Sequence, residues 1–203
     1  MALSWRSLQQ LLDIVARHSA DINMELNTRK SVCMVFNPRN RSRVLLASFP
    51  QFSVNGALLS FVSSFKYLGH IISGTNADDA DIQREITNMF VRTNILLHRF
   101  SLCSNNVKTV LFKTYCLCMY DVALWKIYNL GTLGKLRSCY HRCVKIFFGY
   151  RRRDSMTSIL LTLGLPSFNT VLANASISFA KQWANCSNRI IRVMRNMDLN
   201  YWE

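Results

Sequence analysis

The sequence predicts an α+β protein in which a small lobe containing a β-hairpin precedes an all-helical bundle. Apolar residues follow a strand-like pattern from about residue 32 to 74 and a helical pattern after it. In addition, Asn55-Gly56 separates two short apolar runs. This is the strongest short hairpin signal, because both positions of the turn need a positive φ. We therefore expect an α+β lobe over residues 1–74, a three-helix bundle over 75–153 and a helical tail over 154–203.

The first lobe is predicted to begin with an amphipathic helix that Ser4 caps. Its apolar positions repeat at helical spacing, at Leu8, Leu11, Leu12 and Val15. Further apolar runs predict strands at residues 32–36, 44–49, 52–54, 57–59 and 65–72. Gly69 lies inside the last of these, where a glycine indicates a bulge or the close approach of another backbone.

Three helices with short connections are then predicted, which is typical of an antiparallel bundle. The first carries an apolar stripe from Ile82 to Phe100, with Arg84, Glu85, Arg92 and Arg99 largely off it. The second extends from a cap at Ser104 to about Tyr128. Thr132 is the expected cap of the third helix, and Gly149 is expected to end it. The apolar seam of this helix is predicted at Leu133, Leu136, Tyr140, Cys143, Val144 and Phe147. The tail is predicted to hold helices over residues 155–163, after a cap at Ser167, and over 190–197.

The positive charge is concentrated in the helical part of the chain. The whole sequence carries a net charge of +14, and residues 84–153 alone hold 13 basic and 2 acidic residues, a net charge of +11. Such a field favours a polyanion, above all a phosphate backbone, whereas an ordinary solvated surface mixes charges of both signs. The expected phosphate contacts are Lys135, Arg137, Arg142, Lys145, Arg151, Arg152 and Arg153. Contacts of this kind carry little sequence information.

Composition also restricts the compartment and the metal chemistry. Seven scattered cysteines favour a reducing, intracellular compartment, with no preference between nucleus and cytoplasm. The N-terminus does not resemble a signal peptide, and charges interrupt the apolar run over residues 107–130, so we expect no membrane association. Cys139 and Cys143 would share a helix face that His141 does not, so no zinc site is predicted.

Two short sequence motifs, called boxes here, occur in an order that resembles a known protein family. Asn27-Thr28-Arg29-Lys30-Ser31 precedes an apolar run, and Tyr67-Leu68-Gly69 follows the predicted hairpin. Together with the basic helices and the later Leu163-Gly164-Leu165-Pro166-Ser167, they resemble the C-terminal part of a reverse transcriptase of the non-LTR retrotransposon (LINE) type. The resemblance covers roughly residues 7–185 and implies the end of a polymerase palm followed by a thumb. It implies nucleic-acid contacts at Asn27, Lys30, Tyr67, Leu68 and Gly69, with the last three forming a turn that holds a primer end.

The same resemblance implies a catalytic part that we do not find here. The family holds Mg²⁺ with paired carboxylates on a Tyr-x-Asp-Asp hairpin, which would precede the first predicted helix. We therefore expect these 203 residues to be catalytically incomplete and to hold no cofactor themselves. Asp78-Asp79 follows the second box instead of preceding the first, so we interpret the acids of residues 78–81 as helix caps. Lys30 alone has a catalytic role by analogy, as the acid that protonates pyrophosphate, although a lysine beside a strand also fits.

The expected function is accordingly that of a truncated, reverse-transcriptase-derived protein without polymerase activity. It would bind RNA, DNA or an RNA–DNA hybrid without sequence preference, and a fuller reverse transcriptase is a further expected partner. Two alternatives stay open. One is a helical protein–protein interaction module with an exposed apolar patch, and the other is a retroelement relic without a stable fold.

Overall fold

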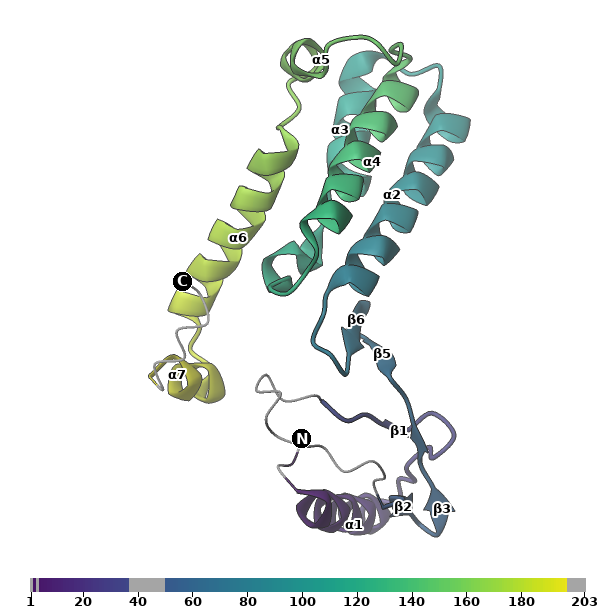
Figure 1. Cartoon of the computed structure of the whole chain (residues 1–203), viewed down its shortest axis with the longest axis vertical. Coiled ribbons are helices and arrows are strands. Elements are labelled where there is room, and N and C mark those ends of the chain that lie inside the picture. The colour runs from purple at the N-terminus through teal and green to yellow at the C-terminus, as the bar shows by residue number, and fades with distance from the viewer. Residues whose placement is uncertain (1, 3, 37–49, 197–203) are drawn as a thin grey trace. The chain divides into compact units, whose positions relative to one another are not determined.

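The computed structural model describes residues 2, 4–36 and 50–196 (Figure 1). Within them the chain is α+β, as predicted, with seven α-helices and three two-stranded sheets. The strand predicted at 44–49 lies outside the described residues. The chain divides into two compact units, Met1–Ala80 and Asp81–Glu203, and each is described by itself.

Helix α1 (Trp5–Asp21) covers the small core of the first unit. It begins at Ser4, whose hydroxyl oxygen accepts a hydrogen bond from the backbone N–H of Ser7, so the predicted cap is confirmed. The side-chain amide of Gln9 donates to the carbonyl oxygen of Ser53 and accepts from its N–H, at 2.9 and 3.2 Å, which fixes α1 against strand β2 (Ser53–Val54). The core consists of Cys33, Phe52, Val54 and Leu59, with Leu8, Leu12, Ala16 and Leu26 packed against it.

The strands of this unit are short. Strand β1 (Val32–Cys33) pairs in parallel with β4 (Ser60–Phe61), and it covers only part of the strand predicted over residues 32–36. Strands β2 (Ser53–Val54) and β3 (Ala57–Leu58) form the hairpin predicted from Asn55-Gly56. Both turn residues have positive φ, 50° and 79°, as this two-residue turn requires.

The single strand predicted over residues 65–72 is wrong. The segment is a second hairpin, in which β5 (Ser64–Tyr67) pairs antiparallel with β6 (His70–Ser73). Leu68 and Gly69 form its two-residue turn with φ values of 49° and 95°. A leucine rarely adopts positive φ, so Leu-Gly lacks the sequence signal of Asn-Gly. Gly69 is therefore a turn glycine and not a bulge.

The second unit is helical. Its elements are α2 (Asp79–Phe100, which starts just before the unit boundary), α3 (Asn105–Tyr115), the short 3₁₀ helix η1 (Tyr120–Leu124), α4 (Leu130–Phe148), α5 (Met156–Leu163), α6 (Phe168–Asn185) and α7 (Arg189–Asn196). One core joins α2 to α6: Ile82, Met89, Phe112, Tyr140, Phe147 and Phe168 are all buried within it. Helices α2, α3 and α4 run up and down beside one another (Figure 1).

The predicted second helix ends earlier than expected. Helix α3 stops at Tyr115, and the chain then turns into η1 instead of continuing to Tyr128. Residues 115–125 are apolar nearly all round, so they carry no periodicity from which a break could be placed. Met119, Val122, Ala123 and Trp125 are buried without a long helix.

Helix α4 matches its prediction except at its start. Asn129, not Thr132, is the cap, and its side-chain oxygen accepts from the N–H of Gly131 at 2.7 Å. Gly149 ends the helix with φ 77°, as predicted. The predicted apolar seam is confirmed, with Leu136, Tyr140, Cys143, Val144 and Phe147 buried.

Helix caps later in the chain also agree with the sequence. Gly164 ends α5 with φ 60°, and the hydroxyl of Ser167 accepts from the N–H of Thr170 at the start of α6. Over the described residues no single helix is long and apolar enough to cross a bilayer; α5 and α6 meet that test of length and composition only as a pair bent by 57°.

Candidate nucleic-acid interface

A groove between α2 and α4 brings together two of the predicted phosphate contacts. Lys135 and Arg142, both exposed, line a groove of about 600 Å³ together with Ile86 and Phe90 of α2. The guanidinium carbon of Arg142 lies 5.6 Å from the centroid of the Phe90 ring, a cation–π distance. The aromatic ring therefore helps to hold this charge at the groove.

Arg137 faces another neighbour. Its guanidinium carbon lies 5.7 Å from the ring centroid of Phe168, and its Nη2 donates to the side-chain oxygen of Asn169 at 3.2 Å. Both partners belong to the start of α6. The structure thus separates Arg137 from Lys135 and Arg142, although all three are close in sequence.

Lys145 closes the loop that follows α4. Its ammonium donates to the backbone carbonyl oxygens of Arg152 and Asp154, both at 2.8 Å. The carboxylate of Asp154 in turn accepts from the backbone N–H of Arg151 at 2.7 Å. These bonds fix the loop and give Lys145 a structural role, while the side chains of Arg151, Arg152 and Arg153 remain exposed.

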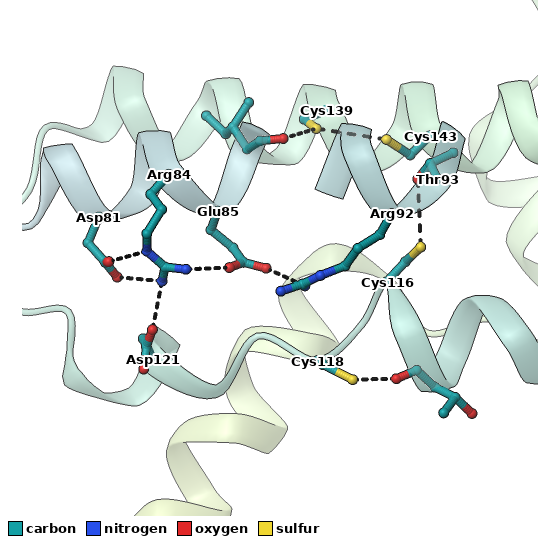
Figure 2. A network of polar contacts seen from close by, with 12 residues as sticks. Asp81, Arg84, Glu85, Arg92, Thr93, Cys116, Cys118, Asp121, Cys139 and Cys143 are labelled. Carbon is teal, nitrogen blue, oxygen red and sulfur yellow. Dashed lines mark hydrogen bonds and ion pairs between the residues drawn. The ribbon is translucent and has the colours of Figure 1, made fainter. Parts of the chain in front are cut away.

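Three acidic residues of the helical unit, Asp81, Glu85 and Asp121, are held in a network of ion pairs (Figure 2). The carboxylate of Asp81 is fully buried and accepts from Arg84, with the shortest distance, 2.6 Å, to Nε. Arg84 Nη2 also reaches Asp121 of η1 at 2.7 Å. Glu85 accepts from Arg84 at 3.4 Å and from Arg92 at 2.9 Å. Two arginines of α2 thus hold three carboxylates.

Two sequence interpretations are corrected here. Asp81 is not an exposed helix cap, because its carboxylate binds Arg84 and also accepts from the indole N–H of Trp125 at 2.9 Å. Glu85, placed off the apolar stripe by its spacing, is only 4 % exposed. Burial is the largest influence on this carboxyl and raises its pKa, while Arg92 and Arg84 act in the opposite direction.

The distribution of charge follows from these contacts. Through residue 196 the acids of this unit are Asp81, Glu85, Asp121 and Asp154, and each accepts a hydrogen bond or ion pair. In the described part of the chain, the cations that form no ion pair include Lys135, Arg137, Arg142, Arg151, Arg152 and Arg153. Because the acids are held in internal contacts, the exposed surface of this unit is more positive than its net charge suggests.

The cysteines of the bundle behave as small apolar residues. Cys116, Cys139 and Cys143 are buried, and the Sγ atoms of Cys139 and Cys143 are 3.9 Å apart. Burial raises the pKa of Cys116 to about 11, so this thiol stays protonated at neutral pH. Cys118 is only partly buried, and all seven cysteines are free thiols.

The two boxes of the first unit form turns. The side-chain oxygen of Asn27 accepts from the N–H of Lys30 at 3.1 Å, and its carbonyl oxygen accepts from the hydroxyl of Ser31 at 2.9 Å. This turn leads into β1 and leaves the side chain of Lys30 exposed. At the tip of the β5–β6 hairpin, Tyr67 is 56 % and Leu68 88 % exposed.

The fold and the charge distribution together define an α+β protein with a strongly cationic helical unit. Comparisons with protein-family models, with curated proteins and with solved structures found no match. Sequence reasoning missed the buried pairs of Asp81 and Arg84, and it missed Phe90 as part of the groove. The spacing of Asp81 and Arg84, three residues apart on a helix, was an available signal.

Proposed function

We propose that this chain is a reverse-transcriptase-derived polypeptide whose helical unit binds the backbone of nucleic acids without sequence preference. The observation that carries the proposal is the separation of charge in this unit. Up to residue 196 its carboxylates are engaged within the structure, whereas Lys135, Arg142 and Arg151–Arg153 present their charges outward.

The physical basis is the release of counterions. A polyanion that meets such a surface releases its condensed cations, and this gives affinity without any contact to base edges. Two arginines cannot contribute in this way, because Arg84 and Arg92 are held by carboxylates. The exposed arginines after α4 can, since only their backbone takes part in the loop.

The proposed origin depends on the order of the two boxes ahead of the basic helices. The turn at Leu68-Gly69 is exposed, as a primer-holding turn must be, and the turn built by Asn27 leaves Lys30 accessible. We propose that these residues bind nucleic acid but do not extend it.

A salt titration tests the binding. Fluorescence anisotropy with labelled double-stranded RNA, duplex DNA and an RNA–DNA hybrid of one length should give similar affinities that fall steeply as salt rises from 50 to 200 mM, by about 10³-fold if six phosphates are contacted. Affinity that is independent of salt, or confined to one sequence, contradicts the proposal.

A protein–protein interaction module is the second candidate. Helix α7 exposes Ile190, Val193 and Met194, which are 69, 50 and 40 % exposed, and an apolar surface of this kind favours association. Multi-angle light scattering separates the two candidates. A concentration-dependent oligomer that disappears on changing Ile190 and Val193 to Ser favours this one, and a monomer argues against it.

A further inference from the structure

The groove between α2 and α4 is more than a charged surface, because it combines an apolar floor with cations. We infer that it receives one unstacked base of a single-stranded nucleic acid, with the neighbouring phosphates on Lys135 and Arg142. The inference rests on the proposed function and narrows it, since a general backbone binder has no reason to prefer an unpaired strand.

The floor has the character of a ligand site. Ile86 and Cys139 are buried to more than nine-tenths, and Phe90 packs against the same core. The groove volume of about 600 Å³ lies within the range of small-molecule sites, which are mostly apolar with a few polar groups. A flat base fits this chemistry better than a phosphate, which needs polar donors all round.

Both cations lie on the α4 side of the groove. Lys135 and Arg142 are seven residues apart on α4, so they share one face at a separation of about 10 Å along the axis. Ser138 lies between them and also lines the groove. Arg142 lies 5.6 Å from the centroid of the Phe90 ring, so a guanidinium and an aromatic side chain, on both of which unpaired bases stack, occur together at the groove.

Two glycines keep the groove open on the α4 side. Gly131 and Gly134 both line it, and glycine within a helix is unfavourable relative to alanine. At Gly134 an added Cβ would meet no atom within 4 Å, so packing does not require a glycine there. Its effect is to let another molecule come close to the helix backbone.

A single strand suits this site and a duplex does not. Bases in a duplex are paired and stacked, so none can enter a groove of this size without being flipped out. An unpaired base is free to enter, and stacking on aromatic or arginine side chains gives roughly five- to 150-fold in affinity per base.

The test uses the full chain and two variants. Gly134→Leu fills the groove and leaves both cations in place, and Asn174→Leu adds the same side chain to an exposed position of α6. The probes are labelled oligo(dT) and oligo(U) of ten nucleotides and a hairpin duplex of equal charge. The parent protein should prefer the single strands by about tenfold. Gly134→Leu should abolish the preference and leave duplex affinity unchanged, while Asn174→Leu should behave as the parent.

A loss of folding in Gly134→Leu is not expected to account for this result. Leucine is a better helix former than glycine, so Gly134→Leu should melt at or above the temperature of the parent. Equal affinity for single strand and duplex, or an unaltered preference in Gly134→Leu, overturns the groove inference and leaves salt-dependent binding standing. If Gly134→Leu instead loses binding of poly-glutamate, the groove takes an acidic protein segment and the inference is wrong. If the parent binds neither nucleic acid, the proposed function itself fails.

Discussion

Asp81 and Trp125 meet in the interior of the helical unit, where the indole N–H of Trp125 donates to Oδ2 of Asp81 at 2.9 Å. The two residues are 44 positions apart, so this bond ties the start of α2 to the end of η1. The same carboxylate binds Arg84, which continues to Asp121. A buried charge is tolerated only when it is paired in this way.

Removing this carboxylate should be among the most damaging single changes in the unit. Asp81→Ala leaves Arg84 with one partner fewer in a largely buried site, and we expect a loss of about 3–5 kcal/mol in the free energy of unfolding. Asp81→Asn retains an acceptor for Trp125 and should lose less. Urea denaturation followed by tryptophan fluorescence measures both. Equal and small losses would show that the ion pairs contribute little.

Glu85 should give stability a pH dependence of unusual sign. Its pKa is raised in the folded protein, so the folded state holds this proton more tightly than the unfolded state does. The contribution of Glu85 is therefore greatest below its ordinary pKa of 4.5 and declines as pH rises through the folded-state pKa. Glu85→Gln removes this decline. The free energy of unfolding of Glu85→Gln should therefore rise relative to that of the parent protein between pH 4 and 8. Above that range the difference should stay constant.

The comparison for Glu85 is between the two proteins at each pH, so other carboxyl groups cancel. Urea titrations of both at pH 4, 5, 6, 7 and 8 give the difference. If the free energy of unfolding of the parent instead rises relative to that of Glu85→Gln as pH rises, the ion pairs with Arg84 and Arg92 outweigh the effect of burial.

Gly74 should resist substitution for a steric reason. A Cβ at this position would lie 2.6 Å from the carbonyl oxygen of Val35, which is backbone and cannot move alone. We expect Gly74→Ala to destabilise the first unit by about 1–3 kcal/mol. Gly134→Ala is the matched control, with no atom near its added Cβ, and it should stabilise by up to about 1 kcal/mol. Hydrogen exchange assigns each change to its unit, and equal effects of the two would refute the steric argument.

Lys145 should matter for stability more than for binding. Lys145→Met keeps the aliphatic stem but leaves the carbonyl oxygens of Arg152 and Asp154 without this donor, at about 1–2 kcal/mol in total. Lys135→Met is the control, because this exposed side chain should alter stability by no more than about 0.5 kcal/mol. Thermal melts compare them. A stable Lys145→Met with weakened nucleic-acid binding would reverse the assignment.

Secondary structure was predicted most accurately where the apolar residues follow a single helical repeat. The apolar seam of α4, from Leu136 to Phe147, could be predicted because its apolar positions repeat at helical spacing and Gly149 marks the end of the helix. The break after Tyr115 was not, since the residues around it are apolar in every direction. The family resemblance implies a turn at Tyr67-Leu68-Gly69, but the apolar pattern missed it, because strand pairing imposes a positive φ that leucine does not signal.

The candidate interface was predicted in part for a related reason. The excess of positive charge is visible in the sequence, but which charges are neutralised depends on contacts between distant segments. Asp121 neutralises Arg84 only because η1 lies against α2. The separation of Arg137 from Arg142 likewise requires knowing that α6 begins beside α4.

The most direct test of the central claim is the salt dependence of binding after removal of Arg151, Arg152 and Arg153. Replacing all three by Gln leaves intact the backbone bonds that fix their loop. For an RNA–DNA hybrid, log K against log salt should become shallower by roughly two to three, the change expected for three lost phosphate contacts. The loss should be the same for unrelated sequences. An unchanged slope in a folded variant would contradict the claim that these exposed cations bind the phosphate backbone.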